Sequence, residues 1–263
     1  MENIFFQIPA WVIAIVIFLL ILFTNWLGYN YRKKLFEKKP ENIPENLGTL
    51  EGSLLGLLAL MLAFSFGMGA TKFESRRSLA VHEANAIGAA IYRLDMYPDS
   101  VKKEFIPDFD KYIDTRMAYY KANFRDGPRN AALKETDEIF DRMWKKATLL
   151  SRDPANLASS QQMIPKLTEM IDLVIERNAL REAKIPFLVL VMLLLLTLVS
   201  AFMSGYSHKA KKRNLVMITA FALMTTFTIY IVLEFDRPQR GVITIDPAQQ
   251  KIMDQKLLLK HSE

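Results

Sequence analysis

Residues 51–77, EGSLLGLLALMLAFSFGMGATKFESRR, decide the fold. Glu51 is followed by 20 uncharged residues, from position 52 to 71. As a helix with a rise of about 1.5 Å per residue, this run is long enough to cross a hydrocarbon core of roughly 30 Å. It carries Gly or Ala on nearly every turn, where a membrane span usually has large apolar side chains. The fold therefore depends on what packs against this helix.

Three further uncharged stretches, residues 9–31, 185–206 and 215–233, are also long enough to span a bilayer. The 263-residue chain is 51% hydrophobic and yet 24% charged, so a large part of it must lie outside the lipid. We therefore predict an all-α integral membrane protein, which has the lipid bilayer as its first partner. Its predicted parts are two spans with a short loop over 1–71, an extramembrane helical bundle over 72–184, two spans over 185–236 and a C-terminal tail over 237–263.

The charges of the two short loops predict the orientation of the spans. These loops hold the basic residues Arg32, Lys33, Lys34, Lys38 and Lys39, and then Lys209, Lys211, Lys212 and Arg213. Short loops rich in Lys and Arg stay in the cytoplasm. Both termini and the bundle are then predicted to be extracytoplasmic. The net charge of +6 is explained by this topology, so we expect no nucleic-acid partner.

Proline positions and apolar periodicity predict helices throughout residues 72–184. Since no proline lies between Pro44 and Pro98, the second span is predicted to continue as one helix to about residue 97. A helix capped by Ser100 is predicted to end at residues 126–128, and the next to cover 130–150. Asp153 before Pro154 predicts the start of another helix. These pieces are expected to form an up-and-down bundle continuous with spans two and three.

Seven small residues recur along the second span at spacings of 4, 4, 3, 4, 4 and 3 residues. They are Gly48, Gly52, Gly56, Ala59, Ala63, Gly67 and Ala70. The average step of about 3.67 residues is close to one helical turn, so they form one line, here called the small-residue stripe. Small side chains let membrane helices approach closely, whereas burying leucine against leucine gains little in lipid. The other faces carry large residues, such as Leu58, that suit lipid or looser packing.

Two interpretations of the small-residue stripe are open. It can pack the second span against another helix of the same chain. Alternatively, several copies surround an axis, because four spans per subunit are few for a complete transport path, and the stripe faces the pore or the neighbouring subunit. The second interpretation predicts a homo-oligomer whose ligands are inorganic ions.

Charged residues mark both ends of the second span. Glu51, at the predicted cytoplasmic entrance, either interacts with the dipole of the helix N-terminus or forms a ring of carboxylates at a pore mouth, which prefers cations. At the other membrane face, spans two and four end in a charge cluster that is expected to pair and to tie the bundle to the spans. Its members are Lys72, Glu74, Arg76, Arg77, Glu234, Asp236, Arg237 and Arg240.

Composition excludes several kinds of chemistry. The chain has no cysteine and therefore no disulfide, thiol nucleophile or thiolate metal site. Its three histidines, His82, His208 and His261, are far apart, and none has a second ligand at helical spacing. Nucleotide-binding and hydrolase motifs are absent. We therefore predict a protein that is not an enzyme and has no metal site and no cofactor.

Two separated motifs, residues 51–93 and residues 233–241 (LEFDRPQRG), resemble the bestrophin-like family of bacterial membrane proteins. The resemblance implies four spans and a place in the bacterial inner membrane. It also implies kinship with bestrophins, which are pentameric anion channels. The chain departs from bestrophins in lacking a recognisable hydrophobic neck and acidic calcium clasp. The bestrophin soluble domain is also cytosolic, whereas loop charge predicts an extracytoplasmic bundle here.

The first motif contains His82, Glu83 and Asn85, about two to three helical turns beyond the membrane. These side chains are a candidate site for an ion or a small ligand. The alternative is that the carboxylate and the carboxamide hydrogen-bond across the bundle.

Two functions follow from these features. The first is an oligomeric ion channel or channel-like transporter with span two near the symmetry axis. The second is a membrane-anchored sensor or scaffold whose external bundle binds a ligand or a partner protein. A sensor needs a cytoplasmic output, and only two short basic loops are predicted there, which favours the channel. The tail is predicted to contain a short amphipathic helix after Pro247, which docks on the bundle, lies on the bilayer or frays.

Overall fold

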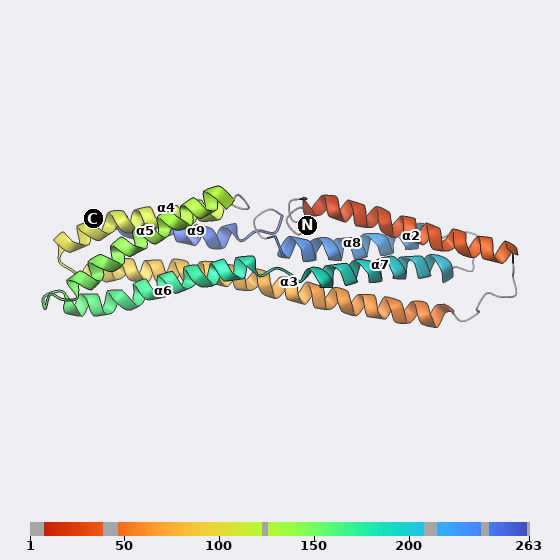
Figure 1. The fold of residues 1–263 in the computed structure, drawn as a ribbon, viewed down its shortest axis with the longest axis horizontal. Helices are drawn as coiled ribbons and strands as arrows, with labels where there is room; N and C mark the ends of the chain where they lie inside the picture. The colour runs from red at the N-terminus through yellow and green to blue at the C-terminus, as the bar shows by residue number, and fades with distance from the viewer. Residues whose placement is uncertain (1–7, 39–46, 123–125, 208–214, 238–241, 262–263) are drawn as a thin grey trace. The chain divides into compact units, whose positions relative to one another are not determined.

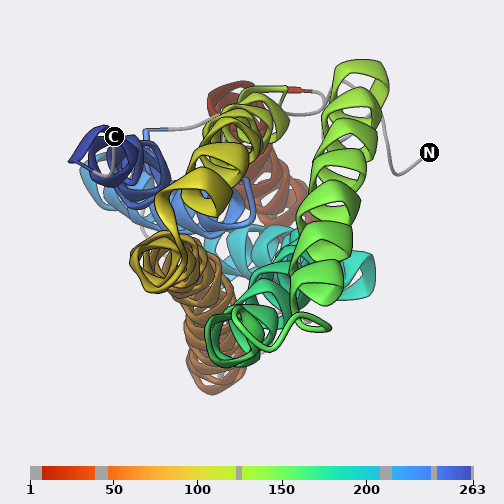
Figure 2. The ribbon, with the colours of Figure 1, turned by 90° about the vertical axis from the view of Figure 1, so that its left-hand side faces the viewer.

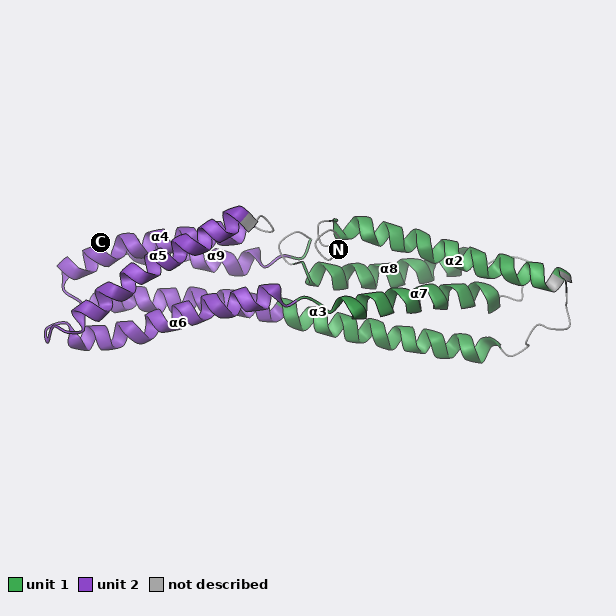
Figure 3. Cartoon of the chain, in the orientation of Figure 1, with its two compact units in different colours: residues 1–73, 184–243 green, residues 74–183, 244–263 purple. Residues whose placement is uncertain are grey.

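The computed structural model describes residues 8–38, 47–122, 126–207, 215–237 and 242–261. Every regular element in these ranges is helical (Figure 1), which confirms the all-α prediction. Four of the helices are long and apolar enough to cross a membrane. The chain divides into two compact units, coloured separately in Figure 3: unit 1 comprises residues 1–73 and 184–243, and unit 2 comprises residues 74–183 and 244–263.

Unit 1 contains the predicted spans. They lie in α2 (Ala10–Lys38), the first part of α3 (Leu47–Tyr92), α7 (Phe187–Ser207) and α8 (Leu215–Phe235). The basic residues Lys39, Lys209, Lys211, Lys212 and Arg213 of the two loops, together with His208, lie outside the described residues. The core of unit 1 is apolar and includes Ile17, Ile21, Leu193 and Ile229.

Two glycines bring α2 and α7 into close contact. A Cβ atom on Gly28 would overlap the backbone carbonyl of Phe202, and one on Gly205 would overlap the carbonyl of Asn25. The Asn25 side-chain amide donates a hydrogen bond to the Ala201 carbonyl at 3.1 Å. Small residues therefore do allow close helix packing inside this chain, but on α2 and α7.

Unit 2 is a helical bundle. It contains the rest of α3, the short 3₁₀ helix η2 (Arg93–Met96), α4 (Asp99–Lys121), α5 (Asp126–Leu150), α6 (Leu157–Glu182), α9 (Asp246–Asp254) and α10 (Lys256–His261). α5 packs on both α4 and α6, and α9 and α10 pack on α4. Figure 2 shows the blue C-terminal helices beside the yellow α4. The core is rich in aromatic and aliphatic side chains, with Phe105, Phe109 and Tyr112 fully buried.

The C-terminal segment is part of this bundle. Ile252 of α9 and Leu259 of α10 are buried in the core of unit 2. Lys256 Nζ lies 2.8 Å from a carboxylate oxygen of Asp110 and 2.8 Å from one of Asp114, both on α4. The docking site of the tail, which the sequence left open, is thus α4 and the core around it.

Three helix boundaries differ from the predicted ones. α4 begins at Asp99 and has no side-chain cap from Ser100, and it ends at Lys121. Residues 126–128 begin α5 instead of ending the preceding helix, because a proline in the first helical turn lacks only an N–H that has no partner there. α6 starts at Leu157, after a turn in which the Asp153 carboxylate accepts from the Ala155 N–H and from the Asn156 side chain.

Candidate functional site

The small-residue stripe lies on a part of α3 that the described residues of the chain leave uncovered. A Cβ atom on Gly48, Gly52, Gly56 or Gly67 would meet no described atom within 4 Å. Ala59 and Ala63 are exposed, and Ala70 is half-buried. In the most apolar 18-residue window of α3, 17% of the residues are buried, against 28% or 33% in the windows of the other three spans. α3 is thus the span that its own chain covers least.

One side of α3 packs against the core of unit 1. Leu58 is only 2% exposed, and Met61 and Leu62 pack against the same apolar cluster. Leu54 and Leu55 are half-buried. These residues had been expected to suit lipid or looser packing. In the structure, this side of α3 packs within unit 1, whereas other large residues of the helix, among them Leu57, Leu60 and Phe64, are exposed like most of the small-residue stripe.

Glu51 is half-buried in the second turn of α3, because this helix begins at Leu47. The interaction between a side chain and the helix dipole falls off within the first turn. The helix dipole therefore stabilises the Glu51 carboxylate less than it would stabilise a carboxylate in the first turn.

Most of the described members of the predicted charge cluster form a hydrogen bond with a backbone group. In unit 1, Lys72 donates to the Lys184 carbonyl, Asp236 accepts from the Ile185 N–H at 3.1 Å, Glu234 accepts from the Val242 N–H at 2.7 Å and Arg237 donates to the Ile8 carbonyl. In unit 2, Arg76 donates to the Ala183 carbonyl at 2.9 Å, while Arg77 and Glu74 form an exposed pair at 3.3 Å. Arg240 lies outside the described residues. These bonds satisfy backbone groups at and beyond the helix ends, which have no partner within a helix.

Glu83 lies at the centre of a buried ionic network in unit 2. Its carboxylate accepts from Arg116 of α4, with Nε at 2.5 Å and Nη2 at 3.3 Å, and also from Arg177 of α6. Arg177 Nη2 donates to the side-chain oxygen of Gln249, on α9, at 2.8 Å. We call Glu83, Arg116, Arg177 and Gln249 the Glu83 network. It joins α3, α4, α6 and α9.

The structure does not bring His82 and Asn85 to Glu83. Both are exposed, whereas Glu83 is fully buried, because neighbouring residues of a helix point in different directions. The partners of Glu83 come from other helices, as the alternative of a hydrogen bond across the bundle describes. No cluster of potential metal ligands occurs among the described residues.

The charges of the Glu83 network stabilise one another. Burial alone would raise the pKa of Glu83, but the positive charges of Arg116 and Arg177 lower this pKa from 4.5 to about 2. Burial alone would lower the pKa of Arg116. The effect of the Glu83 carboxylate is larger in sum with its hydrogen bond, so the pKa of Arg116 is raised. Glu83 and Arg116 are therefore ionised at neutral pH. One carboxylate and two guanidinium groups give these three side chains a net charge of +1.

The sequence contains a signal for the buried position of Arg116. Arg116 follows Tyr112 by four residues and precedes Tyr120 by four, so it lies on the apolar face of α4. A charged residue on such a face is expected to have a buried partner of opposite charge. Arg177 and Gln249 gave no comparable signal, since only the packing of α6 and α9 brings them to Glu83.

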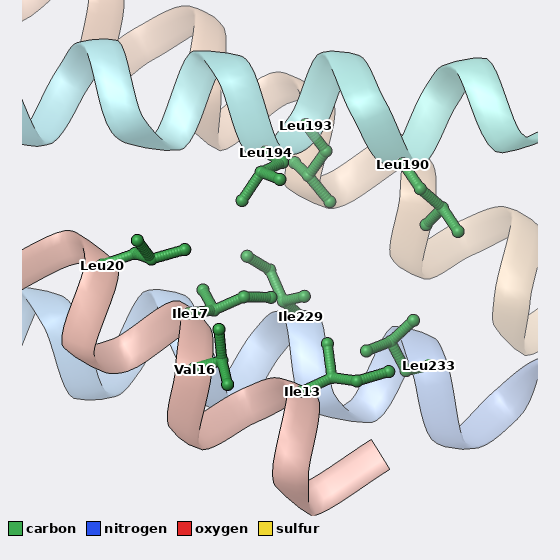
Figure 4. Close-up of a pocket in the computed structure, with 9 residues that line it drawn as sticks. All are labelled: Ile13, Val16, Ile17, Leu20, Leu190, Leu193, Leu194, Ile229 and Leu233. Carbon is green, nitrogen blue, oxygen red and sulfur yellow. The ribbon is translucent and has the colours of Figure 1, made fainter. Parts of the chain in front are cut away.

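Unit 1 also contains an apolar cavity of about 170 Å³. It is lined by side chains of α2, α7 and α8, and in Figure 4 Ile17, Leu193, Leu194 and Ile229 extend into the space between these helices. The lining consists of Ile, Leu and Val side chains, so the cavity suits only apolar groups.

Comparisons with known proteins agree with this architecture. The model of one family, the Bestrophin-like domain, matches residues 15–250. The fold is similar to the crystal structure of a bacterial bestrophin homolog from Klebsiella pneumoniae solved by Zn-SAD phasing, with 11% identity, a TM-score of 0.71 and coverage of 94% of this chain and 97% of that chain. A single-site variant of that homolog gives 11% identity, a TM-score of 0.73 and coverage of 94% and 98%. No curated protein matches the sequence significantly.

Proposed function

The chain belongs to the family of the Bestrophin-like domain, and from this premise we propose that it is an oligomeric membrane channel for inorganic ions in which α3 lies nearest the symmetry axis. The resemblance to bestrophins, which are oligomeric anion channels, supports the class of function. The uncovered small-residue stripe of α3 is the observation that carries the place of this helix.

The packing of α3 favours contact with other copies of the chain. Leu58 and Leu62 pack in the core of unit 1, whereas a Cβ atom on Gly48, Gly52, Gly56 or Gly67 of the small-residue stripe would meet no described atom within 4 Å. Lipid acyl chains gain little packing energy against a surface of glycine and alanine, whereas the backbone of another helix can approach such a surface closely. A closed ring of identical subunits covers the stripe equally in every copy.

The conduction path in this proposal runs between subunits. Four spans in one chain are few for a complete aqueous path, and the cavity in unit 1 is lined by apolar side chains. A ring of α3 helices provides a shared path with Glu51 at its entrance. Repeated around an axis, these carboxylates influence which ions enter.

Ion flux through liposomes tests this proposal. Purified wild-type protein is compared with Glu51→Ala, which removes the carboxylate, and with Gly56→Leu, which adds bulk to the small-residue stripe. The matched control is Val216→Leu, since Val216 is 79% exposed on α8 and the change adds bulk away from α3. A particle image of the same preparation gives the number of subunits and the helix at the centre.

We expect flux from the wild type, reduced flux from Gly56→Leu, a changed ion preference in Glu51→Ala and unchanged flux from Val216→Leu. No flux from any preparation would instead favour the sensor or scaffold. Equal effects of Gly56→Leu and Val216→Leu on ion flux would show that α3 does not line the conduction path.

A further inference from the structure

The Glu83 network and the neighbouring Tyr112 hold more hydrogen-bond donors than the described residues satisfy. Arg116 Nη1, the Tyr112 hydroxyl and Gln249 Nε2 are all buried, and none of them has a hydrogen-bond partner among the described residues. Arg116, Tyr112 and Gln249 are each at most 1% exposed, so bulk water does not reach them. A buried donor without an acceptor costs about 1–3 kcal/mol, and more when it is charged. The Glu83 network and Tyr112 together carry three such donors.

The three donors belong to one small region of unit 2. Arg116 and Tyr112 are four residues apart on α4, which places them on the same face of that helix. Gln249 is joined to Arg116 through Arg177 and Glu83, both of which bond directly to their neighbours in the network. The hydroxyl of Tyr112 is also close enough to Glu83, Arg116 and Arg177 for their charges to affect its pKa.

The charge of the region is positive. One carboxylate faces two guanidinium groups, and burying an uncompensated charge costs several kcal/mol. Two further carboxylates are in electrostatic range, Asp137 near Arg116 and Tyr112 and Asp246 at the Tyr120 hydroxyl, and both are exposed to solvent. Burial raises the pKa of Tyr112, which keeps its hydroxyl protonated and able to donate.

We propose that unit 2 binds one small monovalent anion of the size of chloride, held by Arg116 Nη1, the Tyr112 hydroxyl and Gln249 Nε2. Such an anion accepts hydrogen bonds from all three donors and neutralises the net charge of +1. A water molecule has two lone pairs, so it does not accept from all three donors, and it leaves the charge in place. This site lies in the bundle and does not depend on the proposed conduction path.

The test compares two Tyr→Phe variants of the full-length protein in detergent. Tyr112→Phe removes a hydroxyl without a partner among the described residues, so without a bound anion it should be neutral or stabilising. Tyr97→Phe is the matched control, because the Tyr97 hydroxyl in the same bundle lies 3.0 Å from Ser160 Oγ. Thermal unfolding is followed while chloride replaces gluconate at constant ionic strength.

We expect chloride to raise the unfolding temperature of the wild type. Loss of a hydrogen bond to a charged group should weaken chloride binding in Tyr112→Phe by about tenfold or more. Tyr97→Phe should unfold at a lower temperature with an unchanged chloride midpoint. An unchanged chloride midpoint in Tyr112→Phe would overturn the proposal.

Crystals of the wild type grown in bromide give a second measurement that requires no variant to fold. An anomalous peak within hydrogen-bond distance of Arg116 Nη1 and the Tyr112 hydroxyl is expected. An ordered water molecule at this place, without anomalous signal, would show that the donors bind water only.

Discussion

At the scale of single residues, Glu83 links the stability of unit 2 to pH. Its pKa in the folded protein is about 2, below the ordinary value of 4.5, because two arginines stabilise the carboxylate. A lowered pKa means that the stabilisation is complete above pH 4.5 and is lost as the pH falls towards 2. Over this window the folded state should lose about 3 kcal/mol of stability through this one group.

Glu83→Gln tests this dependence. At neutral pH the variant leaves two buried arginines without a counter-charge, so we expect a loss of about 3–5 kcal/mol in the free energy of unfolding. Its stability should also fall less steeply than that of the wild type between pH 4.5 and 2. Denaturant unfolding of the full chain across this pH range measures both effects.

Glu74→Gln is the control on the same helix. Glu74 forms a pair with Arg77 at 3.3 Å, and its side chain is 62% exposed. Exposed pairs contribute about 0–1 kcal/mol, so this variant should follow the wild type. Parallel acid curves for wild type and Glu83→Gln would contradict the assignment of the pH dependence to Glu83.

At the scale of helices, the pairing of α2 with α7 is set by Gly28 and Gly205. A Cβ atom on Gly28 would overlap the Phe202 carbonyl, which is backbone and cannot rotate away. Gly28→Ala should therefore force the helices apart and cost about 1–3 kcal/mol. Thermal unfolding of the purified protein measures this loss.

Gly127→Ala is the matched change at an open position. Gly127 lies in α5, and a Cβ atom there would meet no described atom within 4 Å. Alanine in a helix is favoured over glycine by up to about 1 kcal/mol, but a residue with a Cβ atom directly before a proline, here Pro128, is disfavoured in the helical conformation. This variant should therefore differ from the wild type by less than about 1 kcal/mol. Equal destabilisation by both changes would show that close approach at Gly28 is not what holds α2 and α7 together.

The helices themselves were predictable because hydrophobic length and period are local properties. The four spans and the aromatic core of α4 follow directly from such patterns. Contacts between helices were less accessible to sequence analysis. The regular glycine spacing drew attention to α3, whereas the close contacts occur at isolated glycines of α2 and α7, whose role depends on the partner backbone.

The candidate site shows the same limit. Glu83 was identified from its position in the first motif, but it was grouped with His82 and Asn85, its neighbours in sequence. Its partners Arg116, Arg177 and Gln249 lie 33, 94 and 166 residues away in the chain. Only the tertiary packing of α4, α6 and α9 brings them together. The start of α6 was missed for a local reason, since Asp153 caps a turn before the helix.

At the scale of the whole molecule, the orientation in the membrane stays a prediction. The basic loops predict that unit 2 is extracytoplasmic, whereas the resemblance to bestrophins implies a cytosolic domain. The chain has no cysteine, so a single introduced cysteine is the only thiol in the protein. Labelling of intact cells with a membrane-impermeant maleimide then reports the side on which that residue lies.

Ala155→Cys and Glu37→Cys form a reciprocal pair for this experiment. Ala155 is exposed in the turn before α6, and Glu37 is exposed near the end of α2. One predicted span separates them, so they should lie on opposite sides of the membrane. Loop charge predicts labelling of Ala155→Cys in intact cells and of Glu37→Cys only after permeabilisation. The reverse pattern would place the bundle in the cytoplasm, and because one of the two variants is labelled in either case, the result does not rest on a failed reaction.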